Sequence, residues 1–291
     1  TMPVRRRNLE IEESHTFVVF GSGKHKETNP FDNRTTQNLT FTYTSNAFIE
    51  VLRALPSLAR NKYPSADTYL GIYETSAIAT FLKQKPEIRK AVEYIKKNPE
   101  KQRNIADAEK TPWLYVAQNI RRHDKDIVNL FEGTNSEKQA EYALRKLSQM
   151  QMSNGGFAWF KGMDDSPWLT ASIVSTIGEL LRLGIAESSN RDLQQIVRKA
   201  VPYLDIQLQK ETKRIAELRE KNQKKVKPEK IFMSSLALET LYARALVDTK
   251  QTDEMKSLVS ILKCAWQFGT TEERVTAATI LTHVGQKEVA G

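Results

Sequence analysis

The chain has 291 residues, of which 40% are apolar and 27% charged, and it carries a formal net charge of +9. This composition is typical of a soluble globular domain. No stretch approaches the roughly 20 apolar residues that a membrane-spanning helix needs, so we expect no direct membrane insertion. The only cysteine, Cys264, excludes an internal disulfide framework and a multi-cysteine zinc site, and we predict that it is a buried apolar residue.

Residues 1–45 differ in composition from the rest of the chain. The segments HTFVVFGSG (15–23) and QNLTFTYTSN (37–46) are rich in β-branched and aromatic residues and predict two short strands. Because a two-stranded hairpin alone is marginally stable, these strands pair with each other or with something outside the chain. We therefore divide the chain into a β-strand segment at 1–45 and a helical domain at 46–291.

From Ser45 onward, apolar residues recur with the period of an amphipathic helix. Two capping-box spacings, Ser136 with Gln139 and Thr270 with Glu273, support individual helix starts. The order predicts a mainly α fold of helical hairpins, whose closure into a ring periodicity alone leaves open. The first predicted helix begins at Ser45 and has an apolar face of Phe48, Val51, Leu52, Leu55 and Leu58. It is followed by helices at 65–82, from Pro86 onward and up to Gly133. The remaining predicted helices are 138–150, Ser166 to Gly184, and about 189–225, 231–247, 253–263 and 271–284.

The segment QMSNGGFAWF interrupts this helical pattern. Its two glycines can adopt positive φ angles and end the preceding helix, while the Phe and the Trp, two positions apart, are predicted to point together toward the helices on either side. The glutamine is expected to bond the turn or the indole. A phosphate-binding loop would need a strand before the glycines and a helix directly after them, so we predict a structural turn. Its residues are Gln151, Gly155, Gly156, Phe157 and Trp159.

Residues 209–230 hold nine Lys and Arg against four Glu. Leu204, Leu208, Ile215 and Leu218 keep one apolar face, so the segment predicts an amphipathic helix with a strongly polar outer side. Binding of nucleic acid is not expected, because acidic residues are interspersed and no aromatic residues interleave for base stacking. Docking of an acidic protein partner remains an alternative to a solvated helix.

The pattern Gln-x-x-Asn-Gly-Gly-Phe-x-Trp resembles the helix-turn motif of α/α toroids, which include terpenoid cyclases, prenyltransferase β subunits and the thioester domains of α2-macroglobulins. The segments on either side of this pattern resemble bacterial α2-macroglobulin-like proteins. They are TPWLYVAQNI, SPWLTASIV and ELLRLGI, together with the upstream segment from LTFTYTSN to TSAIATFL. The resemblance covers roughly residues 37–187. It implies an α/α toroid whose N-terminal strands belong to, or dock on, a neighbouring β domain.

Thioester-bearing members of that family carry Cys-x-Glu-Gln after a Tyr-Pro pair. This chain reads Tyr63-Pro64 and then Ser65, Asp67 and Thr68 at the Cys, Glu and Gln positions. A thioester needs a thiol and a carboxamide, which serine and threonine cannot replace. We therefore predict that Ser65 acts as a helix N-cap and Asp67 as a favourable first-turn charge.

No other residues compose a convincing catalytic or metal site. The His that activates acyl transfer in complement-type members aligns with Leu169, and Cys264 with His283 lacks the Asp-containing pattern of a prenyltransferase zinc site. His15, His25 and His123 show no metal-ligand spacing. A glycosidase on an α/α barrel needs two carboxylates that face each other, and Asp67 and Asp165 are candidates for such a pair. An enzyme with an α/α-toroid fold therefore remains as an alternative.

The resemblance implies a non-catalytic domain of a bacterial protease-trapping protein, an endopeptidase inhibitor of the periplasm or cell envelope. Its partners would be proteases and neighbouring domains of the same protein, with no cofactor and no metal. Without a thioester, capture would be non-covalent. The competing expectation is a protein–protein interaction module that uses the basic helix at 209–230.

Overall fold

The computed structural model describes residues 63–97, 125–221, 232–248 and 250–286, with 23–31, isolated positions between 15 and 58, and 288. Within this part the chain is helical and contains no strand, only an isolated antiparallel bridge between Gln151 and Phe157. The predicted mainly α fold is therefore confirmed. Residues 15, 17 and 19 of the first predicted strand are described and lie in no strand, whereas 37–46 lies outside the described residues.

The helices follow the predicted order, and most of their ends fall within a few residues of the predicted ones. Residues 52, 54–56, 58 and 125–131 are also helical, although Leu58, predicted on the apolar face, is 59% exposed. The bounds are α2 (Ala66–Lys83), α3 (Pro86–Lys97), α5 (Asn135–Met150), α6 (Pro167–Arg182), α7 (Arg191–Lys221), α8 (Ser235–Val247), α9 (Asp253–Ala265), the 3-10 turn η3 (Trp266–Phe268) and α10 (Thr271–His283).

Hydroxyl side chains begin several of these helices. The capping box at α10 is confirmed, because the Thr270 hydroxyl accepts from the Glu273 N–H and the Glu273 carboxylate accepts from the Thr270 N–H. The capping box predicted at Ser136 is wrong. The helix α5 begins at Asn135, so Ser136 lies inside its first turn, where it is buried and donates to the Glu137 carboxylate.

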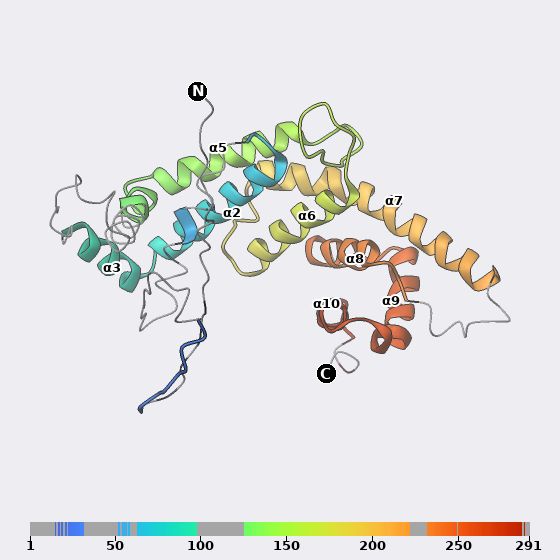
Figure 1. Cartoon of the computed structure of the whole chain (residues 1–291). Helices are drawn as coiled ribbons and strands as arrows, with labels where there is room; N and C mark the ends of the chain where they lie inside the picture. Colours follow the sequence, from blue (N-terminus) through green and yellow to red (C-terminus); the bar gives the residue numbers. More distant parts are fainter. Residues whose placement is uncertain are drawn as a thin grey trace, which may run out of the picture.

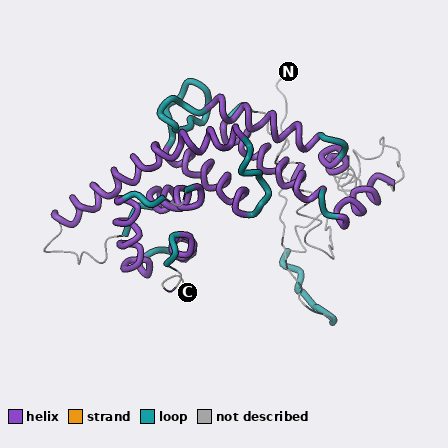
Figure 2. Tube along the Cα trace, turned by 180° about the vertical axis from the view of Figure 1, so that it is seen from behind, coloured by secondary structure: helices purple, strands orange, loops and turns teal. Residues whose placement is uncertain are grey.

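The helices pack as neighbouring pairs along an elongated molecule (Figure 1). The helix α2 packs along α5 and α6 packs along α8, while the long helix α7 contacts α5, α6, α8 and α9. Seen from behind, the same arrangement runs from α3 to the distal end of α7 (Figure 2). Closure of the hairpins into a toroid is not confirmed and stays a prediction.

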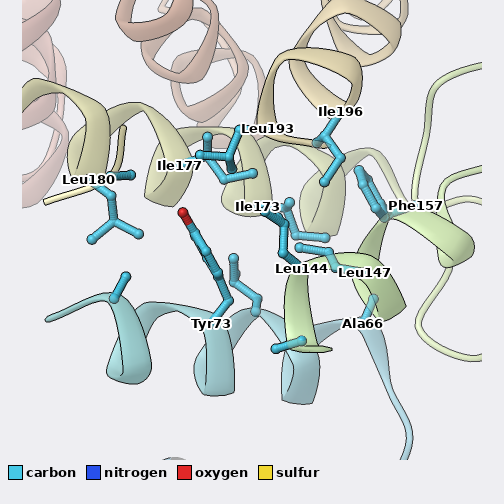
Figure 3. Packing of buried hydrophobic residues seen from close by; sticks show 14 of the residues in the cluster. Ala66, Tyr73, Leu144, Leu147, Phe157, Ile173, Ile177, Leu180, Leu193 and Ile196 are labelled. Atoms are coloured by element: carbon cyan, nitrogen blue, oxygen red, sulfur yellow. The ribbon is translucent and has the colours of Figure 1, made fainter. Parts of the chain in front are cut away.

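One of the two main core clusters lies where α2, α5, α6 and α7 meet (Figure 3). Tyr73 points from α2 toward Ile177 of α6, and burial raises the pKa of its hydroxyl to about 12. The inward face predicted for α6 is confirmed, since Leu169, Ile173, Ile177 and Leu180 are all buried. A second cluster joins the distal half of α7 to α8, α9 and α10. The first cluster holds the candidate site in place.

Candidate functional site

The three positions that the resemblance aligns with a thioester lie at the start of α2. Ser65 has an extended backbone, and its Oγ accepts a hydrogen bond from the Thr68 N–H at 3.1 Å, so the predicted N-cap is confirmed. The Ser65 and Thr68 hydroxyl oxygens are 2.7 Å apart, and both residues are buried. Asp67 is exposed in the first turn. The two hydroxyls thus bond each other and the helix start.

The turn after α5 is held by its own polar groups. The Gln151 Nε2 donates to the Gly155 carbonyl at 3.0 Å and to the Ile196 carbonyl of α7 at 2.9 Å. This confirms the predicted bond to the turn rather than to the Trp159 indole. The Phe157 N–H donates to the Thr170 Oγ1 at 2.8 Å, which ties the turn to α6. Gln151 therefore links the turn to α7 as well.

The two glycines are required by the close approach of α7. Gly155 has φ +90°, and a Cβ there would lie 2.0 Å from the Lys199 carbonyl oxygen. A Cβ on Gly156 would lie 2.8 Å from the Tyr203 ring. Real Cβ atoms do not approach backbone oxygen this closely, so α7 can pack here only against glycine. This close approach supports the structural role predicted for the pair.

The aromatic residues of the turn behave differently from each other. Phe157 is fully buried in the main core cluster, as predicted. Trp159 is 40% exposed, so the side chain that was predicted to point inward together with Phe157 is covered only in part. Its backbone has another role: the Trp159 carbonyl accepts a hydrogen bond from the Ala66 N–H at 3.0 Å. This bond places the start of α2 against the turn. The residues aligned with the thioester and the residues of the turn therefore lie together in one site.

A polar network that the sequence did not reveal fixes the other side of the turn. Asp165 accepts hydrogen bonds from the Tyr203 hydroxyl and, at 2.9 Å, from the Asn154 amide. The Tyr203 bond is the main cause that holds the pKa of Asp165 below its usual value, while burial raises the pKa of Tyr203. Asp165 is thus an ionised anchor for α7. Tyr203 lies 38 residues away in sequence, and no local pattern indicates the pairing.

The remaining candidates do not join this site. Cys264 is exposed, so its predicted burial is wrong, because it lies on the outer side of α9. Leu169 is buried in the core cluster, His25 faces Glu27 at 3.5 Å, and His123 lies outside the described residues. Within the described ranges, no group of three or more His, Cys, Asp and Glu could hold a metal ion. Nor is any described helix long and apolar enough to cross a membrane.

Comparison with known proteins gives one partial similarity. The chain is 37% identical over 65 residues to an alpha-2-macroglobulin homolog of Nostoc sp. strain PCC 7120. Those residues are 22% of this chain and 3% of that protein. No family model and no solved structure matches the chain. The chain therefore has a local similarity to the α2-macroglobulin family and spans only a small part of the relative it matches.

Proposed function

We propose that the chain is a non-catalytic domain of a bacterial α2-macroglobulin-like protein that traps proteases without a thioester. The observation that carries the proposal is the pair of hydroxyls at Ser65 and Thr68, 2.7 Å apart at the positions aligned with the thioester. Ser65 caps a helix that is bonded to the turn through the Trp159 carbonyl. The local similarity to an alpha-2-macroglobulin homolog supports the same family.

The chemistry of this site supports binding rather than catalysis. A nucleophilic serine needs a general base within hydrogen-bond reach. Among the described residues, Ser65 Oγ has hydrogen bonds to the Thr68 N–H and hydroxyl, and to no His, Asp or Glu. Asp165, the carboxylate considered for an enzyme, is held ionised by Tyr203 and Asn154, which suits an anchor better than a general acid. Any capture of a protease would therefore depend on enclosure and non-covalent contact.

The proposal places the whole protein in the bacterial cell envelope, facing the periplasm, with proteases and its own neighbouring domains as partners. To test it, the complete gene product that contains this chain is incubated with a broad-specificity protease. The products are then compared on native and denaturing gels. We expect a protease complex on the native gel that separates fully on the denaturing gel. A covalent conjugate that survives denaturation would contradict the loss of acyl transfer, and no complex on either gel would contradict trapping.

The alternative, an interaction module that docks an acidic protein, has one observation in its favour. The distal part of α7 extends beyond α8 (Figure 1) and exposes Lys210, Lys213 and Lys221. However, Arg214 is already paired with the buried Glu211 at 2.6 Å, which lowers the charge available to a partner. A pull-down that is lost with added salt and with Lys213→Glu would support the module.

A further inference from the structure

The loop between α5 and α6 and the first turn of α6 together expose four large apolar side chains within ten residues of chain. Trp159 is 40% exposed, Phe160 44%, Met163 51% and Trp168 50%. The Met163 N–H donates to the Phe160 carbonyl at 3.2 Å and Gly162 has φ +91°, so the tip is a tight turn. Single exposed apolar residues are normal, but several on one loop mark an interaction site.

The base of this loop is buried and hydrogen-bonded, whereas its tip projects from the body. Phe157 is buried, and the Ser166 N–H donates to the Phe157 carbonyl at 2.8 Å, which closes the loop. Figures 1 and 2 both show the loop at the edge of the molecule, beyond the end of α5. Trp and Phe on a protruding loop can enter the headgroup region of a lipid layer, where amphipathic indole rings are preferred.

The charges near the loop suit an anionic surface. Lys161 belongs to the loop, the backbone of Lys199 lies against Gly155, and the charge of Lys210 acts on Asp165. All three lysines are exposed, and none forms an ion pair within the described part of the chain. Asp164 is exposed, and Asp165 stays ionised although it accepts hydrogen bonds from Tyr203 and Asn154, so the three lysines exceed the two carboxylates of the loop by one charge.

We propose that the loop and the first turn of α6, residues 157–168, bind an anionic phospholipid surface peripherally. The side chains of Trp159, Phe160, Met163 and Trp168 enter the headgroup layer, and the neighbouring lysines contact lipid phosphates. This contact is interfacial, since no described helix could cross a membrane. A lipid surface accounts for both the exposed apolar loop and the lysines around it. The inference does not rest on protease trapping.

The test uses the purified chain with phosphatidylglycerol vesicles and, for comparison, phosphatidylcholine vesicles. Binding is measured by co-sedimentation, and the depth of the tryptophans by quenching with brominated lipids. We expect binding to phosphatidylglycerol vesicles only. Trp168→Ala should weaken it about tenfold, because one partly buried indole is removed. The matched control is Trp266→Ala, which removes another exposed tryptophan, at η3, and should bind as the unchanged chain does.

Three results would overturn the proposal. Failure to bind phosphatidylglycerol vesicles is the first. The second is equal binding by Trp168→Ala and Trp266→Ala, provided that both variants keep the circular dichroism spectrum of the unchanged chain. The third is binding that falls with Lys161→Gln but not with Trp168→Ala, since this would show adsorption by charge without insertion of the loop. If the chain does not bind vesicles but Trp168→Ala weakens a complex of the chain with another protein, the loop is a protein-docking surface instead.

Discussion

Gly155 combines two constraints that are separable by mutation. Its positive φ of +90° disfavours any side chain, and its missing Cβ makes room for the Lys199 carbonyl at what would be 2.0 Å. Gly162, in the same loop, has nearly the same φ, +91°, but a Cβ there would meet no neighbouring atom within 4 Å. The two glycines therefore differ in packing and not in backbone conformation.

Gly155→Ala should lower the free energy of unfolding by more than about 4 kcal/mol, because α7 must move away from the turn. Gly162→Ala should cost only the backbone strain, about 1–2 kcal/mol. Urea denaturation of both variants measures the difference. Similar losses in the two would show that the close approach of α7 does not require glycine.

The pairing of Tyr203 with Asp165 makes a second prediction at this scale. The Tyr203 hydroxyl lowers the pKa of Asp165 below its ordinary 3.8, so the ionised form stabilises the fold above that pH. The stabilisation is lost as pH falls through the lower, folded-state pKa. Tyr203→Phe should therefore cost about 1 kcal/mol at neutral pH, and this loss should shrink in the acid range below about 3.8. A loss that stays constant over that range would contradict the ionised anchor.

At the scale of elements, the helix starts show what local sequence can and cannot predict. Ser65, Ser166 and Thr270 all cap helices, at starts that the sequence predicts. The Ser136 spacing is equally good, but the side chain is buried and bonds Glu137, because packing against the core outweighs a local cap. Local rules thus predict where helices lie better than which hydroxyl begins them.

Two matched substitutions test the cap of α2. Ser65→Ala removes the acceptor of the Thr68 N–H and leaves the buried Thr68 hydroxyl without that partner, so it should cost about 1 kcal/mol or more. Thr134→Ala, at the start of α5, removes no side-chain cap bond and should stay within about 0.5 kcal/mol of the unchanged chain. Thermal unfolding of both variants is the measurement. An equal cost in both would remove the cap as the structural role of Ser65.

At the scale of the whole molecule, the sequence predicted the helical class and singled out the segments at 65–68 and 151–159, but not how these two segments meet. Hydrophobic periodicity was sufficient for the helices, since each needs only its own apolar face. The bond between the Ala66 N–H and the Trp159 carbonyl joins segments far apart in the chain and uses backbone atoms, which carry no residue-type signal. The same reason hides Tyr203 and Lys199, whose contacts depend on the packing of α7 against the turn.

We propose that this domain serves protease trapping by enclosure alone. The most direct measurement mixes the complete gene product with a broad-specificity protease and compares residual activity on a small chromogenic peptide and on a large protein substrate. Enclosure without covalent capture predicts that cleavage of the peptide persists while cleavage of the protein substrate is lost. Equal activity on both substrates would contradict trapping and leave the interaction module as the better account.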